Sequence, residues 1–102
     1  MSDARAPTRG WNALAIHPDD NVAVAIDDIA SGAKVRVRAE ARVTELVASQ
    51  AIALGHKIAL VNLATGDAIV KYGETIGVAS VPIPKGSHVH VHNLASRRGR
   101  QS

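Results

Sequence analysis

The sequence predicts a small, mostly β domain, and three observations carry this prediction. Short runs of Val, Ile, Leu and Ala recur along the chain, and β-branched residues in short runs favour strands. Tight-turn patterns with glycine separate these runs, which is typical of a fold with many short strands. Helical periodicity is almost absent. Hydrophobic residues make up 46% of the 102 residues and the aromatic residues are only Trp11 and Tyr72, so we expect one domain with an aliphatic core.

The expected strands follow one another with short connections. Weak alternation predicts the first strand, a compact apolar run predicts the second, and alternating polar and apolar residues predict most of the others. The stretches with strand character are residues 11–16, 22–26, 34–38, 56–61, 67–72, 75–79 and 88–92. Residues 39–51 fit either a strand or a helical turn, and a strand is favoured because the alternation continues to Val43. Gly77 inside a strand predicts a bulge or a close backbone approach.

A four-residue turn pattern occurs four times. Each copy has an aliphatic residue, two variable residues and a glycine, and each precedes an expected strand. The copies are residues 29–32, 52–55, 63–66 and 83–86. We expect the aliphatic residue to anchor the turn on the core and the glycine to supply a backbone conformation that other residues resist. The uneven spacing argues against a solenoid.

Composition excludes several classes of site and partner. The absence of cysteine excludes disulfides, thiolate zinc sites and cysteine-bound iron–sulfur clusters within this chain. The formal net charge is +3, but residues 11–96 hold seven Lys/Arg and eight Asp/Glu. This near-neutral body lacks the basic, aromatic face of a nucleic-acid binder. No apolar run approaches the ~20 residues of a membrane span, and the N-terminus lacks a signal-peptide apolar region. We therefore expect a cytoplasmic protein that binds neither nucleic acid nor membrane.

The charge distribution also suggests three parts. Residues 1–12 mix Ser, Asp, Arg, Pro, Thr and Gly and are expected to form a flexible arm. The folded domain is expected over residues 13–94. Residues 95–102 carry three arginines and are expected to form a basic, disordered tail.

The strongest chemical signal is a run of alternating histidine and valine near the end of the domain. In a strand, successive side chains point to opposite faces. Val89 and Val91 would then enter the core, while His88, His90 and His92 would form a row on the other face. Neighbours in such a row lie ~6.6 Å apart and the outer pair ~13 Å apart, whereas a zinc–nitrogen bond measures about 2.0–2.1 Å. One ion would therefore bind one or two of these imidazoles, with other ligands from elsewhere.

Three motifs in this order resemble a known family. They are Gly-His-Lys-Ile-Ala-Leu at residues 55–60, Val-Lys-Tyr-Gly-Glu-Thr-Ile-Gly at 70–77 and Gly-Ser-His-Val-His-Val-His-Asn at 86–93. With the opening stretch at 17–25, they are similar to the N-terminal SAF domain of the altronate and galactarate dehydratases. In some relatives, such as the sulfolactate sulfo-lyase alpha subunit, that domain is a separate small subunit. The resemblance covers about residues 17–94 and implies a β-clip, a compact arrangement of short bent hairpins.

The resemblance implies a carbon–oxygen lyase that acts by β-elimination on a sugar acid or another 2-hydroxy acid. The full-length enzymes of the family carry a large catalytic region after this domain, so activity is expected only with a large catalytic dehydratase subunit as partner. These dehydratases are metal-dependent, which implies a divalent ion, iron or manganese, held on this chain or mainly on the partner. The sequence does not specify the hydroxy acid or whether hydroxide or sulfite leaves.

The resemblance, added to the clustering of titratable groups, also favours a set of site residues. The expected catalytic residues are His56, His88, His90 and His92. His88 and His90 are also the expected metal ligands on this chain. Lys57 and Lys71 are expected to hold a substrate carboxylate as point charges.

Two other functions stay open from the sequence. The chain is also compatible with an accessory subunit that only shapes a partner's site. It is equally compatible with a stand-alone β-clip domain that binds a small ligand or a metal without catalysis, an inference from fold alone. Self-association is open as well. The acidic pairs Asp19–Asp20 and Asp27–Asp28 flank turns and are expected to serve those turns more than a metal.

Overall fold

The computed structural model describes residues 10–96, and every helix or strand in that part of the chain is a β-strand. The strands are β1 (Ala13–Ala15), β2 (Val22–Ala25), β3 (Lys34–Ala39), β4 (Arg42–Val47), β5 (Lys57–Ala59), β6 (Ala68–Lys71), β7 (Glu74–Ala79), β8 (His88–Val89) and β9 (Leu94–Ser96). The predicted mostly β class is therefore confirmed. The described residues include no helix that could span a membrane.

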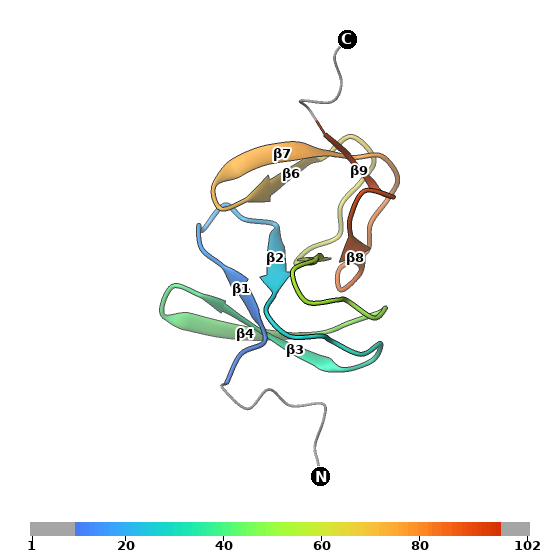
Figure 1. Ribbon diagram of the computed structural model, residues 1–102. Helices are drawn as coiled ribbons and strands as arrows, with labels where there is room; N and C mark the ends of the chain where they lie inside the picture. Colours follow the sequence, from blue (N-terminus) through green and yellow to red (C-terminus); the bar gives the residue numbers. More distant parts are fainter. Residues whose placement is uncertain (1–9, 97–102) are drawn as a thin grey trace.

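The strands form two sheets. Six strands pair in the order β4-β3-β1-β2-β5-β8, and three pair in the order β6-β7-β9. Most pairs are antiparallel, while β1 runs parallel to β3. In Figure 1 the β6, β7 and β9 sheet lies at one end of the domain and the β3–β4 hairpin at the other, with β2 and β8 between them.

The four repeated turns hold the centre of the fold together. Their glycines have φ between 83° and 91°, the left-handed region that a β-turn with glycine at its third position requires. Their aliphatic residues Ile29, Ile52, Leu63 and Ile83 are each at most 5% exposed. They also pair two by two, because Ile29 bridges Ile52 and Leu63 bridges Ile83 through reciprocal backbone hydrogen bonds of 2.8 Å. The predicted anchoring role is confirmed.

Two clusters of aliphatic side chains make up the core. The first lies under β1 to β3 and β5, where Val35, Val37 and Ile58 are almost wholly buried. The second joins the small sheet to the large one through buried residues that include Ile69 and Val89. Since β5 contributes Ile58 to the first cluster and Ala59 to the second, this strand lies between the two.

The structure also defines where the domain begins and ends, and which secondary structure the ambiguous segment adopts. Asn12, expected in the flexible arm, is buried and accepts a hydrogen bond from the Arg36 amide. At the other end β9 runs to Ser96, two residues beyond the expected boundary. Strand β4 occupies residues 42–47 of segment 39–51, which confirms the favoured strand. The rest of the expected arm and tail, residues 1–9 and 97–102, lies outside the described residues.

Gly77 confirms the expectation of a close backbone approach. A β-carbon at this position would collide with the carbonyl oxygen of Ala95 on β9. The neighbouring strand also carries a register irregularity between Ile69 and Val70. Only glycine lets β7 and β9 come this close.

Candidate functional site

The histidine-rich strand is shorter than predicted. β8 ends at Val89, and the chain then forms a turn that the Asn93 side chain closes. The His90 amide donates to Asn93 Oδ1 at 2.9 Å, and Asn93 Nδ2 donates to the His88 carbonyl at 2.8 Å. Val89 is fully buried as predicted, but Val91 is 81% exposed, so its predicted inward orientation is wrong. A side-chain amide that satisfies backbone groups two to five residues away competes with continued strand pairing.

Pairing of β5 with β8 brings His56 next to the histidines near the end of the domain. β5 pairs with β8 in the register Lys57↔Val89 and Ile58↔His88. One further step in this register sets His56 opposite His90, and cross-strand neighbours share one face of a sheet. Their rings stack with centroids 4.0 Å apart and planes 14° apart.

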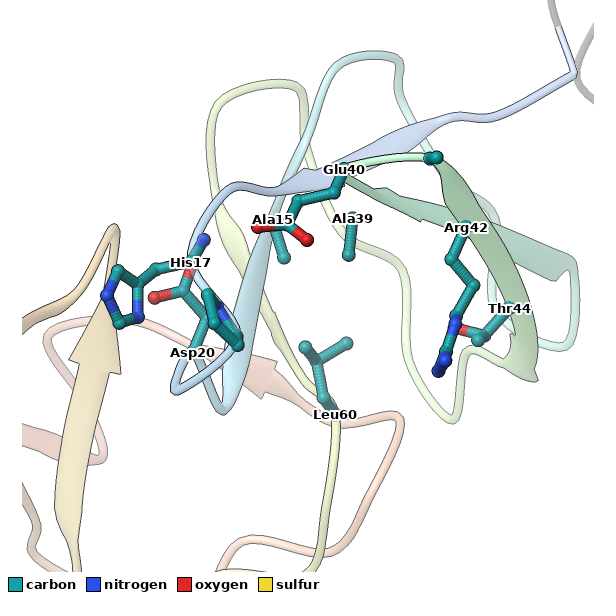
Figure 2. Close-up of a pocket in the computed structure, with 10 residues that line it drawn as sticks. Ala15, His17, Asp20, Ala39, Glu40, Arg42, Thr44 and Leu60 are labelled. Atoms are coloured by element: carbon teal, nitrogen blue, oxygen red, sulfur yellow. The ribbon is translucent and has the colours of Figure 1, made fainter.

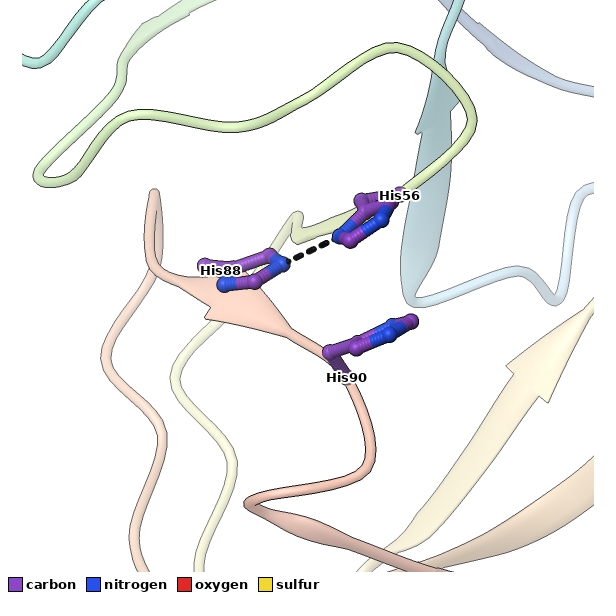
Figure 3. A group of neighbouring side chains, drawn as sticks. All are labelled: His56, His88 and His90. Atoms are coloured by element: carbon purple, nitrogen blue, oxygen red, sulfur yellow. Dashed lines mark hydrogen bonds between the residues drawn. The ribbon is translucent and has the colours of Figure 1, made fainter.

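The histidine cluster therefore comprises His56, His88, His90 and the adjacent His92. His56 Nδ1 and His88 Nε2 share a hydrogen bond of 2.8 Å, drawn as the dashed line in Figure 3. The exposed His92 ring lies 5.2 Å from the His88 ring, centroid to centroid. The expected evenly spaced row, with distant outer members, is wrong because the turn folds His92 back toward His88.

The electrostatic setting favours the uncharged form of two of these imidazoles. Burial, followed by the charges of His56, His92, His90 and Lys57, lowers the pKa of His88. Burial and the charges of His56, Lys57 and His92 likewise lower the pKa of His90. An imidazole with a lowered pKa keeps a ring-nitrogen lone pair free to accept a proton or bind a metal.

The same cluster satisfies the first requirement for a metal site. One ring nitrogen from each of His56, His88 and His90 lies within 4.8 Å of the others. The structure thus places together the two expected ligands, His88 and His90, and adds His56 as a third.

Of the two expected carboxylate-binding lysines, Lys57 lies beside the cluster and Lys71 lies near Lys57. Lys57 follows His56 directly and is half-buried, and its pKa is lowered by burial and by the charge of Lys71. Lys71 Nζ lies 5.1 Å from the centroid of the Tyr72 ring. The ammonium groups of Lys57 and Lys71 repel each other, and such a surface favours an anion.

One member of each acidic pair, Asp20 and Asp28, serves a turn, as expected. Asp20 accepts backbone N–H groups from Ile16, His17 and Gly73, which ties the β1–β2 turn to the β6–β7 hairpin. Burial acts to raise the pKa of Asp20, but these backbone donors outweigh it and the pKa is lowered. Asp28 accepts the amide of Leu54.

Sequence reasoning missed two residues that support the cluster. Gln50 Oε1 accepts the His88 amide at 2.9 Å, although it lies 38 residues away in the chain. Asn93 shapes the turn that carries His90 and His92. An asparagine after a short strand is a recognised turn signal, whereas nothing in the local sequence points to Gln50.

A concave region lies away from the histidine cluster. This hollow of about 620 Å³ is lined by the β1–β2 turn, the tip of the β3–β4 hairpin and Leu60. Figure 2 shows Arg42 and Thr44 of β4 on one side and Asp20 on the other. No member of the histidine cluster lines this hollow, and its Asp20 carboxylate already accepts backbone N–H groups. The hollow is therefore a weaker candidate for a catalytic site than the histidine cluster.

Comparison with known proteins identifies the family. The altronate/galactarate dehydratase SAF domain matches residues 11–97. The chain belongs to this family. The match includes His56, His88, His90, His92 and both lysines, so the whole cluster lies inside the SAF domain.

Individual relatives of this SAF domain are lyases. Altronate dehydratase of Escherichia coli (strain K12) is 44% identical over 80 residues, which are 78% of this chain and 15% of that enzyme. The alpha subunit of (2R)-sulfolactate sulfo-lyase from Paracoccus pantotrophus is 43% identical over 53 residues, 52% of this chain and 79% of that subunit. Galactarate dehydratase (L-threo-forming) of Escherichia coli (strain K12) is 37% identical over 76 residues. The chain thus spans about one seventh of the length of the dehydratases it matches.

Proposed function

We propose that this chain is the small, SAF-domain subunit of a lyase of the altronate dehydratase type. In this proposal it contributes a histidine-lined wall to a site at which a 2-hydroxy acid undergoes β-elimination. A large catalytic subunit supplies the rest of the site. The existence of a relative that is itself a separate alpha subunit supports this division of labour.

The observation that carries the proposal is that Lys57 lies beside the histidine cluster. His56 and His88 share a hydrogen bond, and Lys57 lies close enough to lower the pKa of His88. A 2-hydroxy acid brings a carboxylate, which the ammonium groups of Lys57 and Lys71 would bind as point charges. The imidazoles then lie beside the bound acid, where proton transfer is required.

The reaction assigns the groups as follows. A base removes the proton from the carbon next to the carboxylate, the electron pair forms a carbon–carbon double bond, and the leaving group departs from the neighbouring carbon. A neutral imidazole accepts a proton, and its conjugate acid returns one to a departing hydroxide, which leaves as water. The lowered pKa of His88 suits it to start as the neutral, accepting form. A sulfite leaving group would need no such protonation of an oxygen.

The metal dependence that the family resemblance implies is compatible with this arrangement. A divalent ion, iron or manganese, would stabilise the negative charge that develops on the carboxylate during proton removal. Imidazole nitrogen is a suitable ligand for iron, and His56, His88 and His90 are the residues on this chain that would hold it.

The test is reconstitution with a large catalytic subunit. We expect the two chains to co-purify and to catalyse elimination from a panel of sugar acids and sulfolactate, with neither chain active alone. His88→Ala should reduce kcat at least ~100-fold, which is the lower end of the range for loss of a general acid or base. His17→Ala removes an imidazole from a turn outside the cluster and serves as the matched control.

The lysine assignment has its own control. Lys57→Met should raise KM more than it lowers kcat, because a point charge that binds the carboxylate acts on ground state and transition state alike. Lys85→Met, at an exposed turn, should leave both constants unchanged. Full activity of the large subunit without this chain would overturn the proposal. Binding of the acid without any turnover in the reconstituted pair would favour a non-catalytic binding domain instead.

A further inference from the structure

We propose that this chain binds one divalent transition-metal ion by itself, through ring nitrogens of His56, His88 and His90. The inference deepens the proposed function, on whose metal assignment it builds, because it states that this subunit binds the ion with neither a catalytic partner nor a substrate.

The donor spacing supports the site. The three candidate nitrogens lie within 4.8 Å of one another, whereas ligand atoms around a tetrahedral zinc ion with bonds of about 2.05 Å lie about 3.4 Å apart. The His56–His88 pair, at 2.8 Å, is closer than this, and the widest pair is farther apart. The rings must therefore rotate about their side-chain torsions before the three nitrogens face a common centre.

An unsatisfied buried nitrogen is the second, independent observation. His90 Nδ1 is buried and has no hydrogen-bond partner among residues 10–96. Buried polar atoms in folded proteins nearly always have a partner, and an exception needs an explanation. In the present stack on His56, His90 Nδ1 has no partner. If the His90 ring rotates so that Nδ1 faces a shared ion, the ion becomes the partner of this atom.

Metal binding requires two defined rearrangements. A metal–nitrogen bond lies in the plane of the imidazole ring, so the His90 ring must leave its near-parallel stack on His56, where the planes are 14° apart. The hydrogen bond between His56 and His88 must also open. Whichever of the two facing nitrogens carries the proton must pass it to the other nitrogen of the same ring or to solvent, because only an unprotonated nitrogen binds a metal.

The ligand set indicates the class of ion. Imidazole nitrogens suit zinc, nickel, copper, cobalt and iron, whereas magnesium and calcium prefer oxygen ligands. Three ligands leave at least one coordination position open, as in catalytic zinc sites. The nearby ammonium of Lys57 favours an anion at that position, and this charge would also weaken the binding of the bare cation.

The experiment uses the tag-free chain after treatment with a chelator. Calorimetric titration with Co²⁺ and Ni²⁺ should give one ion per chain, with Ni²⁺ bound more tightly as the general affinity order requires. Bound Co²⁺ should give visible absorption bands of a nitrogen-ligated centre. Mg²⁺ should give no heat of binding at the same concentrations.

Variants locate the site. His56→Ala, His88→Ala and His90→Ala should each weaken Ni²⁺ binding at least 10-fold, while His17→Ala, which removes a histidine outside the cluster, should leave it unchanged. The corresponding Gln variants, with circular dichroism as a check on folding, separate ligand loss from unfolding. Absence of stoichiometric binding, or equal weakening by His17→Ala, would overturn the proposal. An active reconstituted lyase whose small subunit binds no ion would overturn this inference alone, whereas binding without any lyase activity would leave it intact.

Discussion

The two valines of the histidine segment provide the sharpest test of how this segment folds. Val89 lies at the end of β8, is fully buried and belongs to the second core cluster. Val91 is 81% exposed because the chain turns after Val89. A strand through the whole segment would bury both residues equally, so Val89→Ala and Val91→Ala distinguish the two arrangements with the same chemical change.

The expected magnitude follows from burial. Val→Ala removes two carbon atoms, and at ~0.8 kcal/mol per buried methylene the transfer loss at Val89 is about 1.6 kcal/mol. The cavity left beside Ile69 and Ile83, which share its cluster, raises the total cost to about 2–3 kcal/mol. At the exposed Val91 the change should stay within ~0.5 kcal/mol, as for ordinary surface substitutions.

Urea unfolding measures both variants. Trp11 is the only tryptophan in the sequence, and the Arg38 guanidinium lies 4.5 Å from its ring centroid, so its fluorescence should change when the large sheet unfolds. With a slope of about 1 kcal/mol per molar urea for a small domain, Val89→Ala should lower the midpoint by about 2–3 M. Equal losses in the two variants, or a larger loss for Val91→Ala, would refute the turn and the facing derived from it.

Three further predictions concern contacts that hold the two sheets and the site together. Asp20→Asn should destabilise the fold by about 1 kcal/mol, since partly exposed charged hydrogen bonds are weakened by solvent. The folded pKa of Asp20 is lowered from 3.8, so its contribution is present above pH 3.8 and disappears as the pH falls through the lower folded value; acid titration of stability should show a smaller drop in this variant, and an unchanged drop would contradict the assignment. Gly77→Ala should cost about 1–3 kcal/mol because the new methyl group meets the Ala95 carbonyl, whereas Thr75→Ala on the same strand should be nearly neutral in the same urea assay; comparable losses would count against the close approach. Asn93→Ala should release the turn, cost about 1–3 kcal/mol and increase amide hydrogen exchange in residues 88–94; protection equal to that of the unmodified chain would show that the turn does not depend on this side chain.

Much of the fold was accessible from the sequence because its signals are local. A glycine in the left-handed region and an aliphatic anchor are properties of four consecutive residues, so the four turns could be predicted before their positions in space were known. Alternation of polar and apolar side chains likewise predicted β3 and favoured β4. β9 was missed because residues 94–96 offer only three residues of pattern, and their pairing with β7 supplies the rest.

The candidate site shows where local reasoning ended. The sequence by itself determined that the imidazoles and lysines lie within a SAF domain, since the three motifs that carry the resemblance contain them. It could not determine that β8 stops at Val89, because the competing hydrogen bonds of the Asn93 amide depend on a folded turn. It also could not join His56 to His88 and His90, which lie more than 30 residues away. That meeting depends on the register of β5 against β8, and register is set by which faces are buried in the core, a property that only the tertiary structure decides.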